Sequence, residues 1–422
     1  MPTKIFSTFL FLLPIVFLNI KHGANAILFV LFFGAIIFLA KVNISTILKK
    51  TIAKTQILFI FVLVSPTLAV AISQSIRNEF YINNWDAPIR MLLCIPIYLA
   101  ISRGWLLSKG KESITEVWIK WAIPIALIVT FITRVYFPAT NWHGYSTTYF
   151  VDPLSFCSYS LLFAFLACLG AVYYFKEVNN LNKLFYLFTI FVGFYLSITS
   201  GARTGWINLP VFIVILYLYS LIMIGKRDRL YFFLAILLVL AVLLYQNSQF
   251  INKINLGIQE LSNYKKNALN ADTSIEMRIS MYRMGVEYFF ERPFAGWGDL
   301  SWRESTSWRE FTKFASNETI NAPKHGFHNE IITNSVRSGI WGFISVVSLY
   351  IVVAFRAASG IKMKLCRRHR LVSVSILIVI LHLFFAGLVT ETTNLTFLSA
   401  FIGVLLAVLC GEQQYLEENF SN

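Results

Sequence analysis

The chain has 422 residues, of which 57% are hydrophobic, 16% aromatic and only 14% charged. A soluble domain is nearer half apolar and a quarter charged, so this composition excludes a soluble enzyme, a nucleic-acid-binding domain and a disordered chain. Lys and Arg number 36 against 21 acidic residues, a net charge of +15. In a membrane protein such an excess belongs to the cytoplasmic loops. The composition therefore predicts an all-α polytopic membrane protein.

A bilayer core of about 30 Å needs roughly 20 apolar residues per helix. About twelve apolar stretches meet or approach that length. In chain order they are 5–20, 24–40, 57–75, 88–102, 118–136, 153–175, 184–199, 206–224, 230–246, 337–355, 371–390 and 395–411. Some are short, so two of them could form one merged or re-entrant span.

The first stretch also has a second interpretation. Lys4, an apolar run and the small residues of Ala24-Asn25-Ala26 resemble a cleavable signal peptide. A further apolar stretch follows at once, which favours a retained helix.

Basic residues gather in alternate loops, and this sets the sidedness. With the N-terminus inside, the basic segments are 41–54, 103–111, 176–183, 226–229 and 356–370. Both termini are then cytoplasmic, and the one long hydrophilic stretch lies outside. The chain divides into nine spans (1–246), an external loop with amphipathic helices (247–330), and three spans with a short cytoplasmic C-terminus (331–422).

The external loop is expected to be helical. Ile275, Ile279, Tyr282 and Val286 recur at helical spacing, and tryptophans suit a membrane interface. Those tryptophans are Trp297, Trp302 and Trp308. The five cysteines all lie outside this loop, so no disulfide framework is predicted; they are Cys94, Cys157, Cys168, Cys366 and Cys410.

Two histidines end the loop, directly before the next apolar stretch. His325 and His328 are three residues apart and can share a helix face. Histidine is the natural general base at neutral pH. The alternatives are a metal pair, although no third ligand is evident, and simple helix capping by Asn329 with its neighbouring carboxylate.

Two arginines are candidates for binding an anion. Arg203 lies between two spans, flanked by Gly201 and Gly205, and Arg278 lies on the amphipathic loop segment. A guanidinium offers planar paired donors that suit a phosphate or diphosphate. The alternative for each is an interfacial arginine that reaches lipid headgroups.

The absence of two common motifs limits the reactions that the chain could catalyse. The chain has no GxxxxGK[ST] loop for a nucleotide and no Asp-x-Asp pair for a metal-bound sugar nucleotide. An external enzyme must therefore receive its energy in the substrate, and a polyprenyl-diphosphate sugar meets that need.

One long motif resembles a known family. The motif reads Arg278-x3-Tyr282-x2-Gly285-x7-Pro293-x2-Gly296-x-Gly298, then His325-x2-His328-Asn329-Glu330, then Gly339-x2-Gly342. It covers about 275–345 and resembles the O-antigen ligase and polymerase superfamily of membrane glycosyltransferases. The segment that begins at His328 is most similar to lipopolysaccharide O-antigen ligases.

The resemblance implies a helical fold with about twelve spans and one large periplasmic loop, in a Gram-negative inner membrane. It implies metal-independent, inverting transfer of a glycan from undecaprenyl diphosphate to a lipid A–core sugar hydroxyl, without a cofactor. His328 falls on the family's probable base, and Arg203 and Arg278 fall on its diphosphate-binding arginines. Supporting positions are His325, Asn329, Glu330, Arg337, Tyr282 and Trp297, the last of which could stack on a sugar.

Two alternatives to the ligase remain at this stage. An O-antigen polymerase uses the same donor with a second lipid-linked glycan, and one large external loop rather than two favours the ligase. A polysaccharide flippase or other transporter would carry charges deep inside several spans. Most apolar stretches here carry none, with His382 and Arg134 as exceptions.

Overall fold

The computed structural model describes residues 2–41, 54–107, 112–139, 144–246, 252, 255–260, 262, 274–298, 311–313, 315–322 and 326–420. Within these residues the regular structure is helical, and a single isolated bridge pairs Pro138 with Thr148. This confirms the predicted all-α class.

The helices of the first half of the chain are α1 (Pro2–Phe17), α2 (Gly23–Lys41), α4 (Lys54–Arg77), η1 (Ile82–Trp85), α5 (Asp86–Ser102), α6 (Ile114–Val117), the π-turn η2 (Trp118–Ala122), α7 (Ile123–Tyr136), α8 (Pro153–Tyr174) and α9 (Asn180–Thr199). Those of the second half are α10 (Asn208–Met223), α11 (Lys226–Gln246), α13 (Ser274–Glu291), α15 (Asn317–Asn321), α16 (Glu330–Met363), α17 (Arg367–Gly387) and α18 (Thr396–Phe420).

Ten segments of the described chain are helical, long and apolar enough to cross a membrane. Two shorter apolar helices, Lys4–Phe17 and Asn208–Met223, account for the remaining predicted stretches. The chain is therefore a multi-pass membrane protein.

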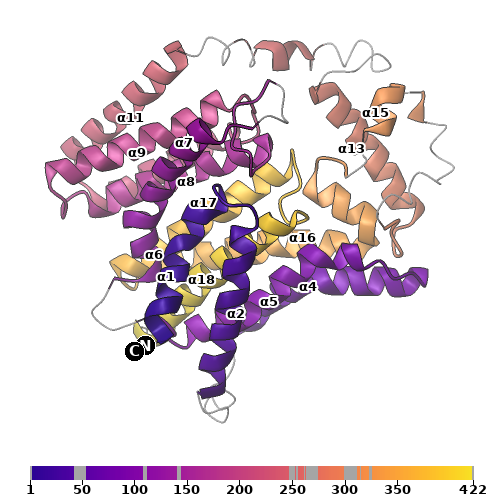
Figure 1. Cartoon of the computed structure of the whole chain (residues 1–422), viewed down its shortest axis with the longest axis horizontal. Helices are drawn as coiled ribbons and strands as arrows, with labels where there is room; N and C mark the ends of the chain where they lie inside the picture. The colour runs from indigo at the N-terminus through magenta and orange to yellow at the C-terminus, as the bar shows by residue number, and fades with distance from the viewer. Residues whose placement is uncertain are drawn as a thin grey trace.

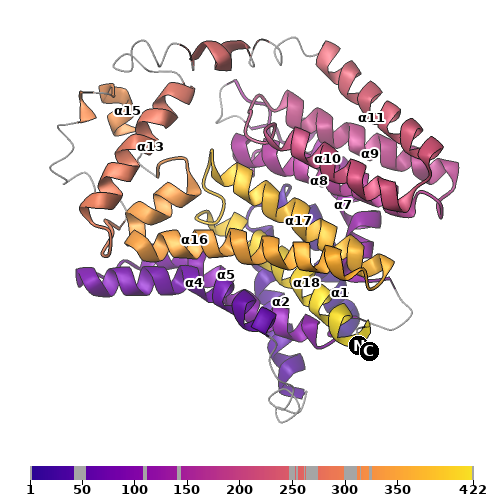
Figure 2. The ribbon, with the colours of Figure 1, turned by 180° about the vertical axis from the view of Figure 1, so that it is seen from behind.

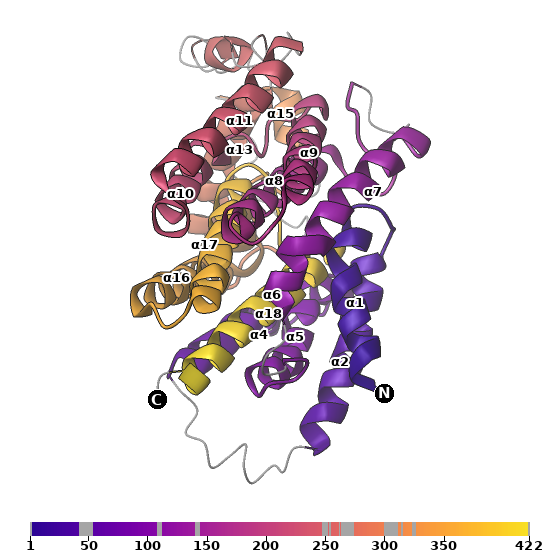
Figure 3. The ribbon, with the colours of Figure 1, turned by 90° about the vertical axis from the view of Figure 1, so that its left-hand side faces the viewer.

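Two helices form the centre of the bundle. Every residue of α8 except Leu154 is buried, and α8 packs on α7, α9, α10 and α17. Helix α18 packs most extensively on α5. Figure 3 shows α18 between α1 and α2 on one side and α16 and α17 on the other.

Helix α16 is longer than the predicted 337–355 stretch and is broken near its start. It runs from Glu330 to Met363, and the backbone leaves helical geometry at Ser338 and Gly339. A hydropathy pattern marks only the apolar middle of such a helix, because its polar ends are stabilised by protein contacts rather than by lipid.

Helices α13 and α15 lie at one end of the molecule, and both chain termini lie at the opposite end (Figures 1 and 2). The predicted helix of the loop is present as α13, but its buried face differs from the predicted stripe. Val286 is 45% exposed, whereas Met281, Met284 and Tyr288 are buried. They pack with a separate apolar cluster that includes Phe311 and Phe327. The helical spacing of apolar residues alone could not show which face of α13 this cluster would cover.

Candidate functional site

Arg203 and Arg278 meet in one cavity of about 440 Å³. Arg203 follows α9 in a turn where Gly201 adopts φ +89°, and Arg278 comes from the second turn of α13. The lining residues are Gly144, Tyr145, Leu154, Gly201, Ala202, Arg203, Thr204, Ile207, Leu256, Ile275, Arg278 and Val389. We call this space the arginine cavity. Leu154, the one residue of α8 that is not buried, lies on its wall.

The arginine cavity carries excess positive charge. Burial lowers the pKa of the Arg278 guanidinium, and the charge of Arg203 lowers that pKa further. Glu260 is 5% exposed at its side chain, and its Oε2 lies 3.6 Å from Nη2 of Arg203. Nε of Arg278 is buried and has no hydrogen-bond partner among the described residues. Glu260 lies beside Arg203 and its charge also acts on Arg278, and an anion in the cavity would further offset the repulsion between the two guanidinium groups and accept from the Arg278 donor.

Tyr282 connects the arginine helix to His328. It lies one turn after Arg278, and its hydroxyl donates to the carbonyl of Leu388 at 2.7 Å. The same hydroxyl is 3.3 Å from the carbonyl of His328. Burial raises the pKa of Tyr282, so the phenol keeps its proton and remains a donor. The sequence grouped Arg278, Tyr282 and His328 in one motif, and the fold links their segments directly.

His328 occupies a constrained position at the start of α16. It is half-buried and has φ +51°, a left-handed conformation that is uncommon for residues other than glycine. Asn329 follows as the helix N-cap, because its side-chain oxygen accepts from the backbone N–H of Ile332 at 3.1 Å. Strained backbone of this kind clusters at functional sites. His325, the other candidate base, lies outside the described residues.

Glu330 is an anchor for the connection between α17 and α18. Its carboxylate is fully buried and accepts from the hydroxyl of Thr392 at 2.8 Å and from the backbone N–H of Thr393 at 3.0 Å. It also accepts from the Thr392 backbone and the Thr393 hydroxyl. These bonds occupy both oxygens, so the Glu330 carboxylate ties the start of α16 to the connection between α17 and α18.

Glu391 is a site residue that the sequence analysis did not single out. Its carboxylate accepts from the hydroxyl of Thr333 at 2.8 Å and from the backbone N–H of His328. Burial raises the pKa of Glu391 to about 7, although the charge of Arg337 opposes that rise. A side chain on Gly326 would overlap this carboxylate, which explains a glycine there. The available signal was an acidic residue in a short connection between two apolar stretches.

The glycines of the motif build a joint between the loop and α16. The break at Gly339, which has φ +61°, lets the backbone N–H of Ile340 donate to the carbonyl of Pro293 at 2.7 Å. A Cβ on Gly339 would lie 2.5 Å from that same carbonyl oxygen. The joint therefore needs glycine for both its backbone conformation and its close approach.

A second set of backbone bonds completes this joint. The N–H of Trp297 donates to the carbonyl of Val336 at 2.8 Å, and the N–H of Gly298 donates to the carbonyl of Arg337 at 3.0 Å. Nη1 of Arg77, from the end of α4, donates to the carbonyl of Ala295 at 2.6 Å. These contacts assign the Gly and Pro positions of the motif to architecture, not to chemistry.

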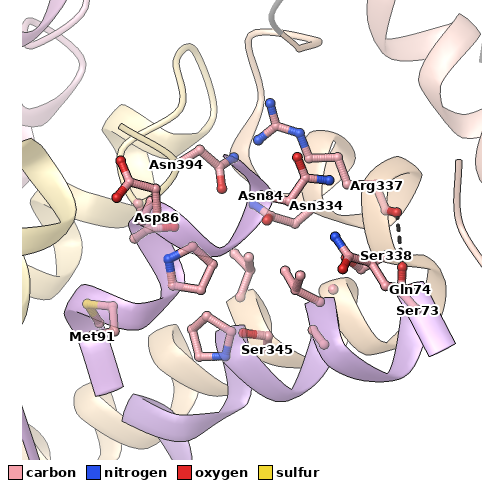
Figure 4. Close-up of a pocket in the computed structure, with 18 of the residues that line it drawn as sticks. Ser73, Gln74, Asn84, Asp86, Met91, Asn334, Arg337, Ser338, Ser345 and Asn394 are labelled. Carbon is pink, nitrogen blue, oxygen red and sulfur yellow. Dashed lines mark hydrogen bonds between the residues drawn. The ribbon is translucent and has the colours of Figure 1, made fainter. Parts of the chain in front are cut away.

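Two supporting positions lie away from the arginine cavity. Trp297 is 4% exposed, its indole N–H donates to the carbonyl of Tyr288, and the guanidinium carbon of Arg292 lies 3.8 Å from its ring centroid. This packing leaves no open ring face for a sugar. Arg337 lines a different cavity, between α4, α5 and α16 (Figure 4). Among the described residues, no group of three or more His, Cys, Asp or Glu side chains could hold a metal ion.

Comparisons with known proteins connect this geometry to a family. Residues 185–347 match the family described as O-Antigen ligase, and that range contains Arg203, Arg278 and His328. A Haemophilus influenzae protein, named only as uncharacterized, is 24% identical over 294 residues, which cover 66% of this chain and 67% of the relative. The family match supports an activity of the O-antigen ligase or polymerase type, catalysed by a membrane glycosyltransferase. Residues 185–347, about two fifths of the chain, are thus similar to the O-antigen ligase family.

Proposed function

We propose that this protein is an O-antigen ligase of the Gram-negative inner membrane. It transfers a glycan from undecaprenyl diphosphate to a sugar hydroxyl of lipid A–core, on the periplasmic side and without a metal ion. The observation that carries the proposal is the meeting of Arg203 and Arg278 in one cavity. A cavity with two guanidinium groups, one carboxylate and an unsatisfied arginine donor suits a diphosphate.

The arginines act on the leaving group. As the glycosidic bond breaks, negative charge grows on the diphosphate oxygen, and fixed positive charge stabilises that transition state more than the ground state. The diphosphate is held by Arg203 and Arg278 from two different segments, so the anomeric carbon is fixed relative to the protein. The apolar wall that includes Ile207 and Leu256 receives the first part of the polyprenyl chain.

His328 acts on the acceptor. Its imidazole takes the proton from the acceptor hydroxyl while that oxygen attacks the anomeric carbon from the face opposite the diphosphate. One displacement of this kind inverts the configuration at the anomeric carbon. The backbone of His328 contacts the Tyr282 hydroxyl and donates to the Glu391 carboxylate, which supports its assignment as the positioned base.

The same machinery would serve a polymerase, whose acceptor is a second lipid-linked glycan. The family match covers both reactions. The lipopolysaccharide of a deletion strain distinguishes them. Loss of a ligase leaves polymerised glycan on its lipid carrier and rough lipopolysaccharide, whereas loss of a polymerase leaves core with a single repeat.

His328→Ala tests the proposal in that deletion strain. Loss of a positioned base typically costs about 10²–10⁴ in rate, so the variant should restore no detectable smooth lipopolysaccharide while inserting at normal levels. His22→Ala, which removes an exposed histidine from the α1–α2 turn, is the matched control and should complement fully. Near-normal glycan attachment with His328→Ala would contradict the base assignment.

A further inference from the structure

A second cavity lies against α16, and its lining differs in chemistry from that of the arginine cavity. Its volume is about 150 Å³, about ten times the roughly 15 Å³ that a single water needs. It lies between α4, the η1–α5 turn, α16 and the connection before α18. Five carboxamide side chains line it, at Gln74, Asn83, Asn84, Asn334 and Asn394. We call it the amide cavity (Figure 4).

Part of this amide set is committed to the fold, and part is not. Gln74 donates to the carbonyl of Tyr81 at 3.1 Å and accepts from the indole of Trp85 at 2.9 Å, so it fixes the η1 turn. The side-chain nitrogen of Asn394 is buried and has no hydrogen-bond partner among the described residues. An unsatisfied buried amide costs free energy unless a ligand or water completes it. Figure 4 shows the amides of Asn84, Asn334 and Asn394 at the same end of the cavity.

Residues of the connection between α17 and α18 line both cavities, first the arginine cavity and then, further along the chain, the amide cavity. Val389 lines the arginine cavity, Glu391 accepts from the backbone of His328, and Thr393 and Asn394 line the amide cavity. On α16, Glu330 holds this connection, and Asn334 donates to the carbonyl of Glu330 at 2.8 Å. Glu391, which accepts from the His328 backbone, therefore lies in the chain between residues that line the cationic cavity and residues that line the amide-lined cavity.

The lining of the amide cavity suits a neutral ligand rather than an anion. Its three charged side chains each have an oppositely charged neighbour: Arg77 pairs with Glu79 at 3.0 Å, Asp86 pairs with Arg90 at 2.5 Å, and the charge of Arg337 acts on Glu391. Carboxamides donate and accept at the same time, as sugar hydroxyls do. Apolar side chains such as Pro66 and Met91 form the rest of the wall and suit the C–H face of a sugar ring.

We infer that the amide cavity binds the sugar of the acceptor glycan and presents its hydroxyl to His328. This inference rests on the proposed glycosyl transfer and adds to it the residues that recognise the acceptor. Exposed Asn83 and half-buried Asn84 form the entrance, and the unsatisfied amide of Asn394 donates to a ring hydroxyl. The acceptor sugar then occupies the amide cavity, and the donor diphosphate occupies the arginine cavity.

The test measures steady-state transfer by the full-length protein in nanodiscs. The donor is an undecaprenyl-diphosphate glycan, and the acceptor is rough lipopolysaccharide or, in a second series, a lipid-linked repeat. Asn84→Ala and Asn394→Leu should each raise the acceptor KM about ten-fold, the effect of losing one ligand hydrogen bond of about 1.4 kcal/mol. The donor KM should not change. Asn321→Ala, an exposed asparagine on α15, is the control.

A binding measurement separates this inference from the proposed function. Saturation-transfer NMR with core oligosaccharide released by mild acid should show contact in the wild type and loss of contact in Asn84→Ala. Active transfer with an unchanged acceptor KM in both variants overturns the amide cavity as the acceptor site. Absence of transfer by the wild type to either acceptor overturns the proposed function, and oligosaccharide binding that is lost in Asn84→Ala would still support the cavity. Absence of oligosaccharide binding by the wild type overturns the inference.

Discussion

At the scale of single residues, the sequence identified candidate side chains for the site but not the residues that surround them in the fold. Arg203 and Arg278 were chosen as phosphate binders from residue type and a motif, and the fold places both on one cavity. Glu391 lies outside that motif. Burial raises its pKa, and that burial depends on contacts with Gly326 and Thr333, which lie about 60 residues away in the chain. The sequence showed only an acidic residue in a short connection between two apolar stretches.

The geometry of the Arg278 guanidinium, and not its charge alone, should matter for donor binding. Arg278→Lys keeps one positive charge but removes the planar pair of donors. Loss of a charge-assisted hydrogen bond of about 1.5–3 kcal/mol should lower kcat/KM for the donor about ten- to hundred-fold. Arg283→Lys, on the exposed side of the same helix, is the matched control and should be silent. Equal activity in the two variants would show that charge suffices at Arg278.

The pKa of Glu391 should give the protein a pH-dependent stability. An unfolded glutamate titrates near 4.5, whereas Glu391 in the folded protein titrates at about 7. Because the folded pKa is the higher, the folded state keeps a proton that the unfolded state has released, so stability falls as the pH rises from about 5 to 7 and then levels off. The glutamine of Glu391→Gln cannot titrate, so the difference between the Tm of this variant and the Tm of the wild type should grow in the variant's favour as the pH rises over that interval.

Thermal unfolding in detergent at a series of pH values measures this difference. Glu287→Gln, on the surface of α13, is the control and should follow the wild type throughout. Parallel Tm curves for Glu391→Gln and the wild type would contradict the raised pKa.

At the scale of elements, hydropathy predicted where helices lie but not how they end. The apolar core of α16 was predicted at 337–355, yet the helix begins at Glu330, whose carboxylate is satisfied by Thr392 and Thr393. Such an end needs a partner from a distant part of the chain. The motif glycines entered the sequence analysis only as part of the family resemblance, and the fold shows that Gly298 and Gly339 help to join the segment after α13 to α16.

Gly339→Ala should break this joint. The new Cβ would meet the carbonyl of Pro293, and alanine disfavours φ +61°. We expect a loss of about 1–3 kcal/mol of stability and a misplaced α13, with Arg278 no longer opposite Arg203. Gly225→Ala is the matched control, since a Cβ there meets nothing closer than 3.9 Å.

Two measurements check this prediction. The Tm of Gly339→Ala should fall, and the donor KM should rise while Gly225→Ala leaves both unchanged. A stable Gly339→Ala variant with normal donor binding would show that α13 is held by other contacts.

At the scale of the whole molecule, the charge of the chain describes orientation more than chemistry. The basic segment 226–229 forms the start of α11, and the segment 362–370 spans the end of α16 and the start of α17. Among the described residues that line the arginine cavity, two are basic, Arg203 and Arg278, and Glu260 lies beside Arg203. Composition therefore predicted a membrane protein, which the ten apolar helices support, and an orientation that stays a prediction. The total charge does not reveal Arg203 and Arg278, which the fold brings together in one cavity.

The orientation itself is testable with reporter fusions, because alkaline phosphatase folds with disulfides only outside the cytoplasm. Basic residues at 362–370 should hold that turn inside. Phosphatase fused after Lys364 or after Phe420 should be inactive, and phosphatase fused after Asn321 should be active. Fluorescent-protein fusions at the same three sites should show the reverse pattern, and immunoblots control for expression. Active phosphatase after Lys364 would invert the molecule, place both cavities on the cytoplasmic side and contradict the proposed periplasmic transfer. The predicted side of the reaction thus depends on a basic segment that begins 34 residues after the candidate base, at the far end of the 34-residue helix α16.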